Sequence, residues 1–169
     1  MKKFIFLKIE AFLILISLFT SCEKEKTSAE IIEDPKLLSN LYSDSVDTLV
    51  IGTNKYFLET YLSRDFMPNT SKNPKHPLTA SITLISYDTL PIPNALQIDK
   101  LYVVYNQLIW VSNPIDNKQT YFPYQLHRVS TNGPEWGPNL DVIVKFIDTS
   151  NQKEYFMITK NQEVLIAWK

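Results

Sequence analysis

The sequence predicts an all-β domain, because short runs rich in Val, Ile, Thr, Tyr and Phe are separated by polar turns. Several of these runs alternate apolar and polar residues, as half-buried strands do, and no stretch after the N-terminal segment keeps a capped helical period. The chain has 169 residues, of which 44% are hydrophobic and 21% charged, a composition typical of one folded domain. We expect an immunoglobulin-like or transthyretin-like sandwich of about seven to nine strands.

The expected strands follow one another with short connections. The alternation is clearest in the second strand, where Tyr56 and Leu58 fall on one face and Phe57 falls on the other. The polar pair at 106–107 predicts a tight hairpin, and the polar residues 148–152 predict a second one. In chain order, the strands are expected at residues 46–51, 55–63, 79–86, 101–105, 108–112, 140–147, 154–159 and 164–168.

The N-terminus has the pattern of a secretory signal. Lys2 and Lys3 open the chain, an apolar run covers residues 11–19, and a charged run begins directly after Cys22. A basic start, a short apolar centre and small residues before the break are typical of an exported protein. The run is too short to span a bilayer, because a membrane helix needs about 20 apolar residues.

The small-small-cysteine ending at Thr20, Ser21 and Cys22 resembles the lipobox of bacterial lipoproteins. The resemblance implies cleavage between Ser21 and Cys22, transfer of a diacylglyceryl group to the Cys22 thiol, and acylation of the new amine. Phe19 departs from the Leu that the family usually has there. Several acyl chains, at about 0.8 kcal/mol for each buried CH₂, make such an anchor effectively permanent. The alternative is an ordinary secretory signal in which Cys22 is incidental.

The charged run at residues 23–26, Glu-Lys-Glu-Lys, is similar to the start of Bacteroidota-type lipoproteins. In that family a charged stretch beside the lipidated cysteine can direct the protein to the outer surface. The resemblance therefore implies a small envelope lipoprotein anchored to the outer membrane, on its periplasmic face or at the cell surface. The solvated start of a tether explains the same four residues equally well.

Residues 22–44 are expected to form a flexible tether, because they are rich in Glu, Lys, Ser and Asp and contain Pro35. Apolar residues between 37 and 42 have the spacing of one or two helical turns, and a helix this short needs a partner surface. The sequence thus divides into a signal peptide (1–21), a lipidated cysteine with its tether (22–44) and a single β-domain (45–169).

Composition argues against several classes of function. The formal charge is −1, so electrostatics gives no reason to expect a nucleic-acid partner. One cysteine excludes an internal disulfide framework and a multi-thiolate metal site, and three glycines leave no phosphate-binding loop. His76 and His127 do not have metal-ligand spacing, and no nucleophile motif is present. We expect no enzymatic activity, no metal and no cofactor.

Two loops are candidates for a binding site, and the first covers residues 64–77. It contains three prolines and an apolar pair, Phe66 and Met67, that an ordinary solvent-exposed loop does not need. Arg64 and Asp65 precede this pair and are candidates either to clamp a ligand or to form a local salt bridge that fixes the loop. Phe66 and Met67 have an alternative role as a cap on the core.

The second candidate loop covers residues 132–139 and places Trp136 between two Gly-Pro pairs. Proline fixes φ, so this loop is expected to be comparatively rigid. A rigid loop that presents an aromatic ring suits a binding surface. It also suits a plug at the end of a sandwich, and tryptophan is highly buried on average. Trp110 and Trp168 lie in expected strands and are expected in the core.

These observations favour a lipid-anchored, non-catalytic binding or accessory module, with a glycan, a host protein or a subunit of an envelope complex as partner. The oligomeric state is left open. One alternative is a structural subunit of a surface assembly that uses strand addition, for which the strand at 164–168 is the candidate edge. A second alternative is a protease inhibitor that inserts a rigid proline-rich loop.

Overall fold

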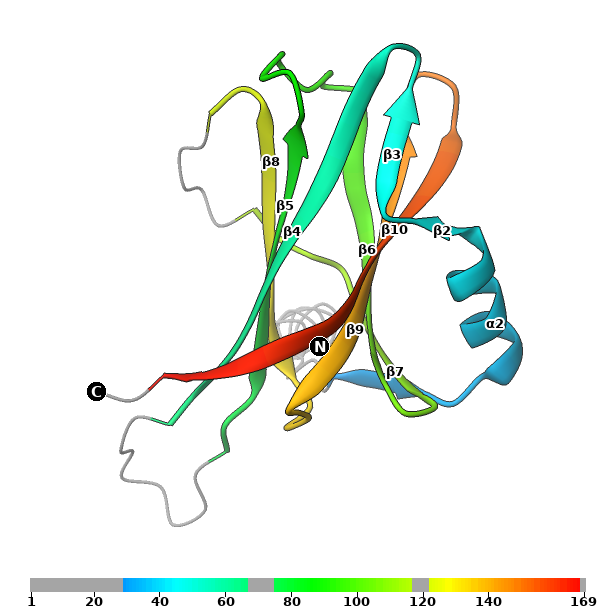
Figure 1. Cartoon of the computed structure of the whole chain (residues 1–169). Helices are drawn as coiled ribbons and strands as arrows, with labels where there is room; N and C mark the ends of the chain where they lie inside the picture. The colour runs from blue at the N-terminus through cyan, green and yellow to red at the C-terminus, as the bar shows by residue number, and fades with distance from the viewer. Residues whose placement is uncertain (1–28, 67–74, 117–121, 168–169) are drawn as a thin grey trace, which may run out of the picture.

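The computed structural model describes residues 29–66, 75–116 and 122–167 (Figure 1). Over these residues the chain forms strands and one short helix, so the all-β prediction is confirmed. The elements are β1 (Glu30–Ile32), α2 (Pro35–Asp44), β2 (Ser45–Val46), β3 (Thr48–Ile51), β4 (Asn54–Asp65), β5 (Leu78–Ser86), β6 (Leu96–Tyr105), β7 (Leu108–Ser112), β8 (Gln125–Gly133), β9 (Asn139–Asp148) and β10 (Lys153–Ala167).

All strands belong to one mixed, curled sheet. Its order is β1-β7-β6-β9-β10-β4-β5-β8, with β2 paired to β10 and β3 paired to β4. The curl brings the two ends of the sheet together, because the segment after β7 pairs with β8 through Ile115 and Val129. Each of these residues donates its backbone N–H to the carbonyl of the other, at 2.9 Å. The architecture is therefore sandwich-like, with two facing halves that meet along this seam.

β10 connects the two halves of the sheet. Its first part pairs antiparallel with β9, and its last residues, 164–167, pair parallel with β4. A bulge at 160–161 interrupts the pairing with β9, which resumes at residues 162–163, and Asp141 Oδ1 accepts the backbone N–H of Asn161 at the bulge at 2.7 Å. The sequence predicted two strands with a turn between them. The structure has one continuous strand, in which the polar residues form a bulge and the pairing partner changes from β9 to β4 after residue 163.

The main core lies between the two halves and is formed by inward-facing side chains of β4, β5, β6 and β9 together with Trp110 of β7. A second cluster lies on the outer face of β6 and β9, where α2 covers the sheet (Figure 1). Leu41 of α2 is buried there against Ile143 and Ile158. Asp34 caps this helix by accepting the Leu37 N–H at 2.9 Å, and Pro35 occupies its first turn.

The fold begins earlier in the chain than we predicted. Residues 30–44, which we assigned to the tether, form β1 and α2, so the short helix is present but packs on the sheet instead of belonging to a free linker. β1 pairs antiparallel with β7, with Glu30 opposite Val111. The strand β8 and the first half of β6 were not predicted either. The expected signal peptide, Ser21, Cys22 and the first part of the tether lie outside the described residues.

Candidate functional site

The structure brings the two predicted loops together at one end of the sheet. Arg64, at the end of β4, forms an ion pair with Glu135 of the second loop, and Nη2 lies 2.9 Å from Oε2. The Nε–H of Arg64 donates to the carbonyl of His76 at 2.8 Å. The other carboxylate oxygen of Glu135 accepts the backbone N–H of His76 at 3.0 Å. Arg64 and Glu135 therefore connect the loops to each other, which favours the role of Arg64 in a salt bridge that fixes the loop.

Phe66 belongs to the same cluster. Its ring stacks on the His76 ring with 4.2 Å between centroids and an angle of 14° between the planes, and the Arg64 guanidinium carbon lies 5.0 Å from the Phe66 centroid. The Nδ1 atom of His76 lies 2.6 Å from the carbonyl oxygen of Asp65. Met67, the other predicted apolar residue, lies outside the described residues. The described part of this loop is thus held by internal contacts.

Trp136 is half-buried and packs against the main core. Its ring centroid lies 5.7 Å from that of Tyr105, with the planes tilted by 31°. This arrangement favours the plug over the exposed binding aromatic, because the indole is partly buried against the core. Phe66 is half-buried as well, so neither of these two predicted aromatic side chains stands out into solvent.

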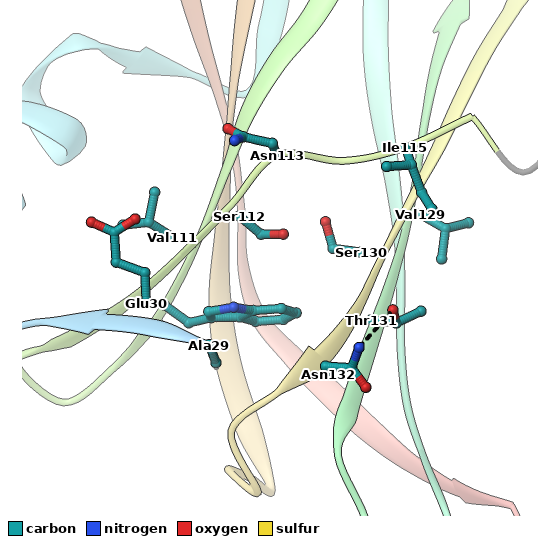
Figure 2. A pocket seen from close by; sticks show the side chains of 11 residues that line it. Ala29, Glu30, Val111, Ser112, Asn113, Ile115, Val129, Ser130, Thr131 and Asn132 are labelled. Atoms are coloured by element: carbon teal, nitrogen blue, oxygen red, sulfur yellow. Dashed lines mark hydrogen bonds between the residues drawn. The ribbon is translucent and has the colours of Figure 1, made fainter. Parts of the chain in front are cut away.

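A cavity of about 310 Å³ lies at the seam, between the end of β7 and β8 (Figure 2). Trp110 and Ser130 form its buried part, with exposed fractions of 2% and 3%. Exposed residues from β1, β8 and the segment after β7 form its rim. The full lining is Ala29, Glu30, Trp110, Val111, Ser112, Asn113, Ile115, Val129, Ser130, Thr131 and Asn132.

The polar side chains of this seam cavity are hydroxyls and amides, together with the Glu30 carboxylate at the rim. Figure 2 shows the Ser112 and Ser130 hydroxyls pointing toward each other from opposite strands. The Ser130 Oγ atom is buried and has no hydrogen-bond partner among the described residues. Nearby, the Asn132 side-chain amide lies 3.5 Å from Thr131 Oγ1, and its backbone adopts a φ of 63°. A buried hydroxyl without a partner is unusual, since most buried polar groups are hydrogen-bonded.

Groups with a shifted pKa are dispersed over the described part of the fold and do not gather in this cavity. Burial, reinforced by a hydrogen bond to Asp141, raises the pKa of Tyr42 well above its ordinary value. Burial lowers the pKa of His127, whose Nδ1 lies 2.9 Å from Thr83 Oγ1. The hydrogen bond to Glu154 raises the pKa of Lys145, which lies on β9. Such scattered groups do not form an acid–base pair.

Neither a metal site nor a membrane helix is found in the described ranges. No group of three or more His, Cys, Asp or Glu residues there is arranged to hold a metal ion. No helix among these residues is long and apolar enough to cross a membrane. The fold and its site thus define an all-β domain with a polar cavity, sized for a small ligand, at the seam of a curled sheet. In comparisons with known protein families, curated proteins and solved structures, the chain matches none of them.

Sequence reasoning missed the residues of the seam cavity. Ser112 was expected as the end of a strand, and Asn132 was expected in a loop. Ser130 drew no attention, because a serine in a polar stretch carries no signal of burial. Leu126, Arg128 and Ser130 lie on one face of β8, and because two of the three are polar, the sequence has no alternation of apolar and polar residues there that would indicate a strand.

Proposed function

We propose that this protein is a lipid-anchored lipoprotein of the bacterial envelope whose β-domain acts as a non-catalytic binding or accessory module. The observation that carries the anchor is the single cysteine of the chain, which follows a basic start, an apolar run and two small residues. Acylation of Cys22 would hold the folded domain at the membrane surface. The outer membrane is the proposed location, with the domain on the periplasmic face or at the cell surface.

Binding is proposed instead of catalysis because the Glu30 carboxylate is the one titratable group among the residues that line the candidate site, and it has no second group there with which to form an acid–base pair. The seam cavity has a buried, unpartnered hydroxyl and an accessible rim, two features that suit recognition of a polar ligand. The partner would be a glycan, a host protein or a subunit of an envelope complex. The strand-addition alternative is less favoured, because residues 164–167 of the candidate edge already pair with β4.

Mass spectrometry of the protein isolated from its native membrane tests the anchor. The expected mature chain begins at Cys22 and carries acyl groups, and a Cys22→Ser variant is expected to be released from the membrane fraction. Ser28→Ala, a substitution in the same N-terminal part of the chain, serves as the matched control and should remain membrane-bound. A wild-type chain that retains residues 1–21, or that begins at an unmodified residue, would contradict the proposal.

A further inference from the structure

We propose that the seam cavity binds a small, neutral, hydroxyl-rich ligand of about one sugar ring in size. This inference rests on the proposed function as a binding module and names the ligand class of its site. Its basis is the combination of a buried hydroxyl without a partner, a lining of further hydroxyls and amides, and an apolar wall formed by Trp110.

The cavity is formed by the backbone arrangement of the sheet. β1 occupies the edge of β7 up to Val111, and the pair Ile115–Val129 joins the segment after β7 to β8 further along. Continuing the register of that pair by two residues places Asn113 opposite Thr131. No backbone hydrogen bond joins these two residues, so the strands diverge between the β1–β7 pairing and the Ile115–Val129 pair. A cavity between such strands has firm walls, because both are held in the sheet on their far sides.

The lining chemistry selects a neutral polyol. Ser130 presents a hydroxyl that both donates and accepts, and its missing partner is a group that a ligand hydroxyl can supply. Ser112 faces it from the opposite wall (Figure 2), and Asn132 adds an amide at the rim. Trp110, which is 2% exposed, closes the buried end of the cavity with apolar indole atoms. A ligand of this kind would supply the missing partner of Ser130 at that buried end.

The charge of the lining and the volume of the cavity restrict the class of ligand further. Among the eleven lining residues Glu30 is the one charged side chain, and it lies at the exposed rim. A phosphate or carboxylate ligand would find no cationic side chain among these lining residues. The Glu30 carboxylate, in contrast, readily accepts hydrogen bonds from the hydroxyls of a neutral ligand. The volume of about 310 Å³ is near the lower end of the range for small-molecule pockets. It therefore suits one ring and excludes a long chain from the buried part.

The test is a titration of the whole mature protein in a zwitterionic detergent that has no sugar headgroup. The probes are D-glucose, D-galactose, N-acetyl-D-glucosamine and myo-inositol, each added up to about 50 mM, because single-ring ligands commonly bind in the millimolar range. Nuclear magnetic resonance follows saturation transfer to each probe and the shifts of the Trp110 indole and Asn132 amide signals. We expect saturable binding of at least one probe, with shifts at both reporter residues.

Two variants test whether the probe binds in the seam cavity. Ser130→Ala should weaken the affinity about tenfold, because one hydrogen bond in the buried part is lost. Asn132→Gly keeps a backbone that tolerates positive φ and should weaken the affinity by a smaller factor. The matched control is Ser86→Ala, in which a buried serine outside the cavity is changed, and its affinity should equal that of the wild type.

The inference is overturned if no probe binds saturably, or if Ser130→Ala binds as tightly as the wild type. These outcomes are separate from the fate of the proposed function. If the protein is acylated and captures an envelope component equally well with and without the Ser130→Ala change, the proposed function is supported and the seam site is contradicted. If the protein is not acylated but binds a probe in a Ser130-dependent manner, the seam site is supported and the lipid anchor is contradicted.

Discussion

Replacing Gly133 by alanine tests the packing at the end of β8. A Cβ atom at this position would lie 2.5, 2.6 and 2.8 Å from three atoms of the Trp110 indole ring. Contacts this short require the ring or the strand to move, and Trp110 is 2% exposed in the main core. Overpacking of a core costs about 1–3 kcal/mol, whereas alanine in a strand gains about 0.5–1 kcal/mol over glycine. We expect Gly133→Ala to lower the unfolding free energy by about 1 kcal/mol, the difference between the two terms.

Urea denaturation followed by circular dichroism measures this loss, and two further variants establish its cause. Trp110→Phe shortens the side chain and removes the ring atoms nearest to the new methyl, so Gly133→Ala should cost less in that background. Gly52→Ala is the matched control: its φ is 62° and nothing lies within 4 Å of the added Cβ, so its cost comes from the backbone and should be the same in both backgrounds. An equal cost of Gly133→Ala with and without the large ring would refute the steric argument.

Three further predictions concern the loops and the buried histidine. Trp136→Ala should lower the unfolding free energy by about 2 kcal/mol, because the half-buried indole packs on the core. Urea denaturation measures this loss, and a loss below about 0.5 kcal/mol would contradict the role of Trp136 as a plug. Glu135→Ala should lower the unfolding free energy by about 1 kcal/mol at low salt and by less in 1 M NaCl, because its ion pair with Arg64 is partly exposed. Thermal melts at both salt concentrations measure this loss of stability. A loss that is equally large in 1 M NaCl would argue against the ion pair. Burial, followed by the nearby Arg128 charge, lowers the pKa of His127, so the unfolded state takes up a proton first as the pH falls below about 6.5 and stability decreases. His127→Gln should remove that part of the decrease between pH 7.5 and 5 in urea titrations, and an unchanged pH dependence would exclude His127 as its source.

The strands with clear alternation were predictable, and those without it were not. β4 and β5 place apolar residues at every second position, and these face the core. β8 carries Leu126, Arg128 and Ser130 on the corresponding face, so its binary pattern is broken where it borders the seam. Its place in the fold depends on pairing with β5 and with the segment after β7, which is long-range information that a local pattern does not contain.

The beginning of the domain was mispredicted for a related reason. The apolar side of α2 needs a partner surface, and the sequence stretch itself does not identify one. The signal lay in β9, where Val142, Ile143 and Val144 are consecutive apolar residues. Such a run indicates a strand covered on both faces, and the outer face is the one on which α2 packs.

Proline, glycine and aromatic content drew attention to two loops, and the structure shows that these loops meet at one end of the sheet. The role of Glu135 as the residue that joins them depends on a distance across the fold, between residues 64 and 135. The seam cavity could not be predicted, because it arises where two strands far apart in the sequence diverge, and neither strand alone indicates that divergence.

The early start of the fold at β1 limits how far the domain can extend from a lipid anchor. Seven peptide bonds connect Cys22 to Ala29, and Ala29 lies in the wall of the seam cavity. At ~3.5 Å for each residue, this segment spans at most about 25 Å. With Cys22 acylated as proposed, that wall of the cavity would stay within a few nanometres of the bilayer. Its ligands would then be molecules that reside at the membrane surface or diffuse close to it, and structures standing far above the lipid would lie beyond its reach.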